Sequence, residues 1–216
     1  MKKSLLSLSI PSYLHKITLL AFFLLTLGVG QVLAADKIIY TLKPTTGSNN
    51  GYANNCDVEI DDITWNITGN SQMVPWRIGG KSITNTDRMV YSKTAMGSAI
   101  TKVELTVVAA SSITVNSLKL LVASDADFNT QIDEVSATFT ANSTITFMPS
   151  SPATEWATGA YYKFVFNVTV SGSSNKFVEF SKAEFYAEEA SPSYSITAQS
   201  SNDTHGTVSL SGSTIT

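Results

Sequence analysis

The feature that most constrains this chain is the alternation of apolar and polar residues along it. In the clearest run every second residue is apolar: Tyr162, Phe164, Phe166, Val168 and Val170. Successive side chains of a β-strand point to opposite faces, so a period of two predicts a strand with one buried and one solvated face. No segment shows a convincing 3.6-residue apolar period, the pattern of a helix packed on a core. The chain is therefore predicted to be all-β.

The same alternation recurs, and turn-forming residues separate the runs. Further runs lie at residues 63–68, 102–107, 118–122 and 134–139. Gly, Asn, Ser, Asp and Pro gather between the runs, as they do in turns. Seven or more strands at this spacing predict a jelly-roll-like two-sheet β-sandwich of about eight strands. Between Phe180 and Ala183 the apolar positions change phase, which predicts a β-bulge near Ser181.

The start of the chain has the pattern of a cleavable export signal. Lys2 and Lys3 open it, an apolar run extends from Ile17 to Val29, and Val32-Leu33-Ala34 supplies small residues for cleavage. The apolar run has 13 residues, fewer than the roughly 20 that a membrane helix needs. An uncleaved N-terminal anchor is the alternative. We predict that residues 1–34 are a signal peptide, that the mature protein is secreted or held at the cell surface, and that no membrane span remains after cleavage.

The rest of the chain divides at a polar linker. Residues 35–187 carry the strand pattern and are predicted to form the β-sandwich domain, and residues 188–193 are the linker. Residues 194–216 hold two short strand patterns, which predict a truncated β-repeat. A two-stranded hairpin is marginally stable by itself in water. We therefore expect this sequence to be a monomeric module of a longer chain.

Composition argues against several functional classes. Three of the 14 basic residues lie in the predicted signal, which leaves 11 basic against 17 acidic residues. An acidic protein lacks the positive surface that nucleic acid requires, so no nucleic-acid partner is expected. The only His residues, His15 and His205, lie outside the sandwich, and Cys56 is the only Cys. His-dependent hydrolases and common zinc sites need residues that the sandwich lacks. We expect a protein that is not an enzyme and has no cofactor, although glycoside hydrolysis by carboxylates stays open.

Two Trp residues in predicted loops are candidates for binding a glycan. An aromatic face can contact a sugar ring while planar amides, Arg or acids hold its hydroxyl groups. One loop holds Trp76 beside Pro75, and another holds Trp156 beside Glu155. The candidate ligand-binding residues are Trp76, Arg77, Asn70, Gln72 and Trp156. The alternative for both indoles is packing into the ends of the sandwich.

Acidic residues gather at two places. One group could supply oxygen ligands to calcium: Asp125, Asp127, Asp133 and Glu134. That segment lacks the Gly and the distal Glu of an EF-hand loop, so we interpret it as a solvated turn and predict no metal site. The second group alternates with apolar residues, as on a polar strand face: Asp57, Glu59, Asp61 and Asp62. A hydrolytic pair would need two of these carboxylates opposed across a cleft.

Two stretches carry family resemblances. Residues 65–81 (WNITGNSQMVPWRIGGK) and 161–172 (YYKFVFNVTVSG) resemble a β-sandwich module of exported proteins from Bacteroidales-type gut bacteria. The overall pattern over residues 37–187 is similar to galactose-binding-like (discoidin-like) jelly rolls. The tail from Tyr194 resembles the opening half of a divergent internalin B-type repeat, a type of surface-exposed spacer.

These resemblances bear on function only as expectations. Galactose-binding-like modules commonly bind glycans or cell surfaces, which implies a glycan or cell-surface polysaccharide as partner. Similarity of fold does not establish function. The sequence thus predicts a non-catalytic exported or cell-surface module that binds glycan. The alternative is a structural or adhesive spacer that contacts proteins or displays a downstream domain.

Overall fold

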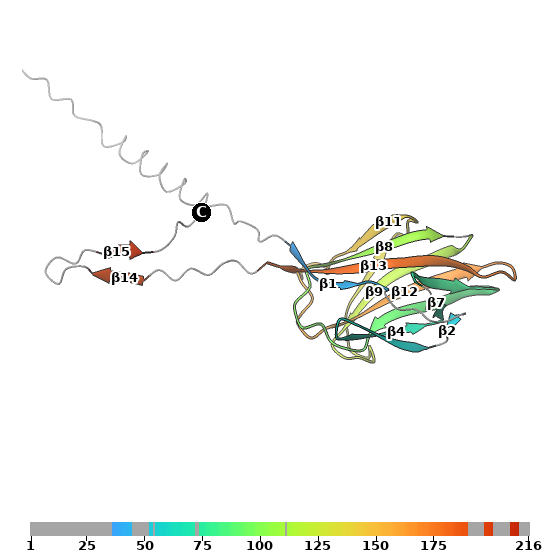
Figure 1. Ribbon diagram of the computed structural model, residues 1–216, viewed down its shortest axis with the longest axis horizontal. Helices are drawn as coiled ribbons and strands as arrows, with labels where there is room; N and C mark the ends of the chain where they lie inside the picture. Colours follow the sequence, from blue (N-terminus) through green and yellow to red (C-terminus); the bar gives the residue numbers. More distant parts are fainter. Residues whose placement is uncertain are drawn as a thin grey trace, which may run out of the picture. The chain divides into compact units, whose positions relative to one another are not determined.

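Two antiparallel sheets form the body of the described chain (Figure 1). The computed structural model describes residues 36–44, 52–53, 55–71, 74–110, 112–189, 197–200 and 208–211. The chain divides into two units, residues 1–34 and 35–216, and every described residue belongs to the second. The predicted signal peptide lies outside the described residues and stays a prediction. Among the described residues there is no helix of the length and apolar character needed to cross a membrane.

The larger sheet has seven strands. Their hydrogen-bonded order is β11 (Ser143–Phe147), β8 (Lys102–Ala110), β13 (Lys176–Glu188), β6 (Trp76–Gly80), β5 (Asn70–Ser71) and β2 (Tyr52–Ala53). The seventh strand, β1 (Asp36–Leu42), pairs with the second half of β13.

The smaller sheet has six strands. Their order is β10 (Gln131–Ala137), β9 (Thr114–Ala123), β12 (Tyr161–Val170), β7 (Ile83–Ser92), β4 (Ile63–Thr68) and β3 (Cys56–Ile60). In the tail, β14 (Thr197–Ser200) and β15 (Val208–Ser211) pair with each other in a separate hairpin.

The predicted all-β, two-sheet β-sandwich is confirmed. The two sheets hold more strands than the roughly eight that the alternation predicted. β2 and β5 show why, because each has two residues and is too short to display a period of two.

The inward faces of the two sheets meet in an aromatic core. All the apolar residues of the alternating run in β12 are buried, as predicted. Phe164, from the six-stranded sheet, lies between rings of the seven-stranded sheet. Its centroid is 6.1 Å from that of Phe147, 5.7 Å from that of Phe180 and 6.5 Å from that of Phe185. Burial of each such side chain is worth about 1.5–3 kcal/mol, so the two sheets are held together by packing.

The predicted bulge in β13 is confirmed at Ser181. The register of β13 against β8 shifts between Phe180 and Lys182, and Ser181 is the extra residue. Phe180 and Ala183 are both buried although they are three positions apart. The bulge therefore returns the second half of β13 to the core phase.

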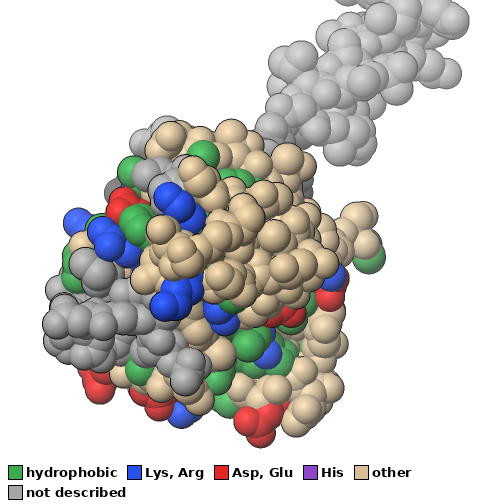
Figure 2. All heavy atoms as spheres, turned by 90° about the vertical axis from the view of Figure 1, so that its right-hand side faces the viewer, with side chains coloured by type: hydrophobic (Ala, Val, Ile, Leu, Met, Phe, Trp, Pro, Cys, Tyr) green, Lys and Arg blue, Asp and Glu red, His purple; other side chains and the backbone are tan. Residues whose placement is uncertain are grey.

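The two ends of the sandwich differ in whether the domain's first and last strands or its turns lie there. Asp36, which starts β1, is paired with Glu188, which ends β13. The sandwich therefore begins and ends at one pole, here called the terminal pole (Figure 1). The opposite, distal pole carries the turns at Lys81–Ser82 and Ser171–Asn175. Figure 2 faces the distal pole and shows mainly backbone and uncharged polar side chains, with Lys and Arg gathered on one side.

Candidate functional site

Trp76, the first predicted glycan-binding residue, lies in the core. It starts β6 opposite Phe180 of β13, and the two ring centroids are 5.8 Å apart at 40°. Its side chain has no exposed surface. The indole therefore presents no face to a sugar in this structure, and the packing alternative describes its position.

Trp156 is also buried, near the terminal pole. Its backbone bridges to Ile100, and its ring lies edge-on to Tyr162 with centroids 5.9 Å apart. The indole Nε1 donates a hydrogen bond to Asp133 Oδ2 at 2.8 Å. The side chain is 1% exposed, so Trp156 closes this end of the core and its ring does not reach solvent.

The other three predicted residues do not gather around an exposed aromatic ring. Arg77 follows Trp76 in β6 and so points to the outer face of the sheet. Its guanidinium lies 4.3 Å from the centre of the Phe177 ring, and its Nε is 3.8 Å from Glu179 Oε1. Asn70 is in β5, where only its backbone is described, and Gln72 lies outside the described residues. The described side chains of the predicted set thus do not form one site.

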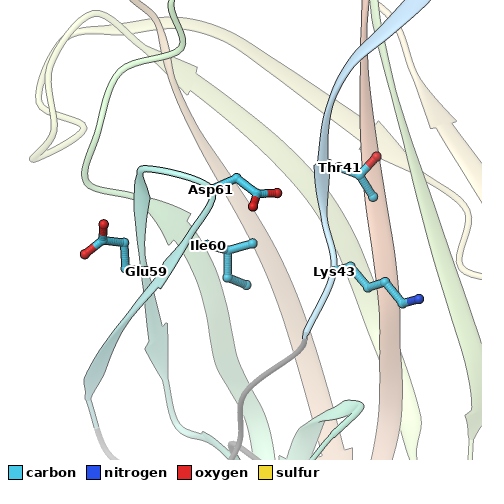
Figure 3. A pocket seen from close by; sticks show the side chains of 5 residues that line it. All are labelled: Thr41, Lys43, Glu59, Ile60 and Asp61. Carbon is cyan, nitrogen blue, oxygen red and sulfur yellow. The ribbon is translucent and has the colours of Figure 1, made fainter.

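A groove at the seam between the two sheets is a site that the sequence did not reveal. It has a volume of about 410 Å³. Its lining residues, called the seam groove, are Thr41, Lys43, Glu59, Ile60 and Asp61 (Figure 3). The first two belong to β1 and the segment after it, and the others to the β3–β4 hairpin. The groove therefore joins an edge of each sheet.

A tight turn and one cross-sheet contact form this groove. The β3–β4 turn consists of Asp61 (φ 48°) and Asp62 (φ 64°), the two positive φ angles that a two-residue type I′ hairpin turn requires. Tyr40 Oη donates to the Ile60 carbonyl at 3.0 Å and accepts from Trp65 Nε1 at 2.8 Å. Burial raises the pKa of Tyr40 to about 12, so the phenol keeps its proton. β1 is thereby tied to the hairpin across the seam.

The charges of the seam groove have no protein partner in the described part of the chain. Lys43, Glu59 and Asp61 take part in none of its ion pairs. Figure 3 shows the carboxylate of Asp61 extending towards β1, while Glu59 extends to the other side of the hairpin. The two carboxylates therefore do not face each other as a hydrolytic pair does.

Four carboxyl groups outside the groove are stabilised as anions. Four described carboxyl groups have a clearly shifted pKa, and in all four the pKa is lowered: Asp57, Glu104, Asp125 and Asp133. Burial would raise the pKa of Asp133, but hydrogen bonds from the Ser150 and Trp156 N–H groups outweigh it. A glycosidase general acid needs the opposite, a raised pKa.

The loop considered for calcium is organised by its own hydrogen bonds. Asp125 accepts the backbone N–H groups of Asp127 and Asn129 at 3.1 Å and that of Thr130 at 2.6 Å. These donors lower the pKa of Asp125. Among the described residues, no group of three or more His, Cys, Asp or Glu side chains is placed to hold a metal ion. The carboxylate acts here as the centre of a turn.

Comparison with known proteins adds no family. No protein-family model and no curated protein matches the chain. The resemblances to galactose-binding-like modules and to internalin B-type repeats therefore remain predictions. The class that the described residues define is that of an all-β, two-sheet sandwich protein with a polar groove along its seam.

Proposed function

We propose that this chain is a non-catalytic module, secreted or displayed at the cell surface, that binds glycan in the seam groove. The observation that carries the proposal is that Lys43 and Asp61, two charged residues lining that groove, take part in no ion pair among the described residues. Charged groups that the protein leaves unpaired at a concave surface are available to a ligand. The export of the module rests on the predicted signal at residues 1–34.

The lining chemistry suits a ligand rich in hydroxyl groups. Thr41 offers a hydroxyl, Lys43 an ammonium donor and Asp61 a carboxylate acceptor. Hydrogen bonds to ionised groups are shorter and stronger than neutral ones. Ile60 adds an apolar surface on which the C–H groups of a sugar can rest. A volume of about 410 Å³ is within the range of small-molecule sites, roughly 300–1,000 Å³.

The same features support binding without catalysis. Glu59 and Asp61 extend in different directions (Figure 3), and neither His of the chain lies in the described part. Among the described residues that line the groove, no opposed carboxylate pair is arranged to cleave a glycosidic bond.

The test is affinity gel electrophoresis of the full chain in a panel of soluble neutral and acidic polysaccharides. We expect at least one polysaccharide to retard the wild-type chain, and Asp61→Asn and Lys43→Met to weaken that retardation. Asn tolerates positive φ at the turn, so the hairpin should persist in the first variant. The matched control is Glu134→Gln, an exposed carboxylate of β10 that pairs with Lys119 away from the groove. Unchanged retardation in both groove variants would refute the assignment of the site.

A structural or adhesive spacer is the second candidate. The burial of Trp76 and Trp156 favours it, because neither indole is available to a sugar. The shared terminal pole of β1 and β13 suits a module that displays its distal pole away from the rest of a longer chain. No retardation by any polysaccharide, together with retained folding, would favour this candidate over glycan binding.

A further inference from the structure

Two irregularities in the six-stranded sheet flank the distal end of β12. Against β9, the register shifts between Asn167 and Val168, and Asn116 becomes the extra residue. Against β7, the register shifts between Val168 and Val170, and Asn85 (φ 45°) lies in the irregular segment. β-bulges redirect side chains and are enriched beside functional sites. Here two bulges lie opposite the same short stretch of β12, one in β9 and one in β7.

The bulges bring polar side chains from three strands into contact. Asn116 Nδ2 lies 3.0 Å from Asn85 Oδ1, 2.9 Å from Asn167 Oδ1 and 2.9 Å from Thr169 Oγ1. Asn167 Nδ2 in turn donates to Asp87 Oδ1 at 2.7 Å. These residues, called the amide cluster, lie on the outer face of the sheet: Asn85, Asp87, Asn116, Asn167 and Thr169.

The amide cluster contains hydrogen-bond donors and acceptors that its internal contacts do not use. A side-chain amide nitrogen carries two hydrogens, whereas three oxygens surround that of Asn116. Among the described residues, no side chain or backbone group forms a hydrogen bond with the Asn85 amide nitrogen, the Asn116 amide oxygen or Asp87 Oδ2. All three of these residues are exposed. One donor and two acceptors of the cluster are thus without a hydrogen-bond partner among the described residues, and hydroxyl groups of a sugar can donate to and accept from such groups.

An aromatic group lies further along the same two strands. Tyr91 of β7 is paired with Lys163 of β12, about 13 Å from the amide cluster at four residues of strand rise. Phe128 lies edge-on to Tyr91 with ring centroids 5.9 Å apart, and Lys163 Nζ is 3.8 Å from the centre of its ring. Phe128 has φ 57°, which is strained for a bulky residue. The half-buried Met89 and Val165 lie between the two groups.

We propose that the outer face of β7 and β12 is a second binding site, for an uncharged, hydroxyl-rich chain such as a neutral polysaccharide. The amide cluster holds its hydroxyl groups, and the Met89–Val165 surface with Phe128 contacts its apolar faces. An uncharged ligand fits the amide cluster, whose single ionisable residue is Asp87. Lys163 lies at the other, aromatic end of this face, over the Phe128 ring. The site shares no residue with the seam groove, so either site can fail without the other.

The test follows the side-chain amide signals of the full chain by NMR during titration with neutral polysaccharides (starch, xylan, mannan, mixed-linkage β-glucan) and with anionic polygalacturonate. We expect a neutral polysaccharide to shift the Asn85, Asn116 and Asn167 signals. Asn116→Ala should weaken binding roughly tenfold. The control Asn142→Gly removes an exposed amide between β10 and β11, suits the positive φ of 55° at that position, and should leave binding unchanged.

Each other outcome counts against the proposal. If no neutral polysaccharide shifts these signals, or if only polygalacturonate does, the site does not exist as described. If the wild-type chain binds and Asn116→Ala binds equally well but melts earlier, the cluster is structural. Because the titration of the wild-type chain needs no variant, a poorly folded Asn116→Ala protein does not prevent a decision.

Discussion

The outer faces of the two sheets are both polar, but the distal half of the six-stranded sheet uses different side chains from the seven-stranded sheet. On the seven-stranded sheet, charged residues stand in neighbouring pairs: Arg77 with Glu179 (3.8 Å), Lys102 with Glu104 (3.1 Å) and Lys182 with Glu184 (2.7 Å). Glu104 also accepts a hydrogen bond from the Tyr186 hydroxyl at 2.9 Å. On the distal half of the six-stranded sheet, the amide cluster takes the place of such pairs.

Both faces are polar enough to lie against water, but they differ in how readily a ligand can use their polar groups. An ion pair satisfies both of its members, so a ligand must displace a protein partner before it can use either group. The amide cluster leaves a donor and acceptors unused, and a ligand gains those hydrogen bonds without breaking others. Salt screening also differs, because it weakens exposed charge pairs and has little effect on neutral amides.

The largest expected effect concerns the core on which both faces depend. Trp76→Ala should lower the free energy of unfolding by about 3–5 kcal/mol, because it removes a fully buried indole and leaves a cavity beside Phe180. Urea denaturation followed by far-ultraviolet circular dichroism measures the change. Trp76→Phe, which keeps an aromatic ring, should lose much less.

The same variants separate the core role of Trp76 from its predicted role in glycan binding. If Trp76→Ala unfolds at the wild-type urea concentration but no longer binds polysaccharide, the indole contacts ligand and the packing described above is wrong.

The alternation gave the buried positions of the strands, since it reports directly on which face a residue occupies. In the run at residues 63–68, for example, Trp65 lies on the apolar phase and is fully buried. Trp76 was placed in a loop because Pro75 precedes it, yet β6 begins directly after the proline. Arg77 and Trp76 are predicted to share one site because they are adjacent in the sequence. Adjacent residues of a strand point to opposite faces, however, so the two side chains are separated by the sheet.

The two proposed sites depend on contacts that a single sequence does not encode locally. The seam groove requires β1 to lie beside the β3–β4 hairpin, which Tyr40 secures across 20 residues of chain. The bulge at Asn116 did leave a signal, because Val115 and Leu118 both pack inwards at a spacing of three. No comparable signal marks the bulge near Asn85, where the flanking residues are polar.

A smaller effect is expected where β6 approaches β13 in the seven-stranded sheet. A Cβ atom on Gly79 would lie 2.1 Å from the Lys176 carbonyl oxygen and 2.8 Å from Phe177 Cα. Because both are backbone atoms, the strands must separate, and Gly79→Ala should cost about 1–3 kcal/mol. Thermal unfolding measures this loss. Gly97→Ala is the control, since nothing lies within 4 Å of its added Cβ, and equal losses in both variants would contradict the close approach.

Acid should weaken the edge of the six-stranded sheet through Asp133. Its pKa is lowered in the folded protein by the N–H groups of Ser150 and Trp156, which outweigh burial. A carboxyl group with a lowered folded-state pKa stabilises the fold above its unfolded pKa of 3.8, and that contribution is lost as the pH falls through the folded value. Asp133→Asn should cost about 1 kcal/mol at neutral pH.

Urea denaturation of wild-type protein and Asp133→Asn at a series of pH values tests this account. The difference between the two proteins should shrink as the pH falls below 3.8. A difference that stays constant, or that grows in acid, would show that the Asp133 carboxylate is not what secures the Trp156 loop.

The smallest expected effect compares the two faces directly. A double-mutant cycle with Lys182→Met and Glu184→Gln should give a coupling of about 0.2–1 kcal/mol, as for other partly exposed ion pairs. Added sodium chloride should reduce that coupling because the pair is accessible to counter-ions. The coupling between Asn116→Ala and Asn85→Ala, measured in the same way, should be similar in size but insensitive to salt, since neither residue is charged. If salt weakens both couplings equally, the two faces do not differ in the way their contacts indicate.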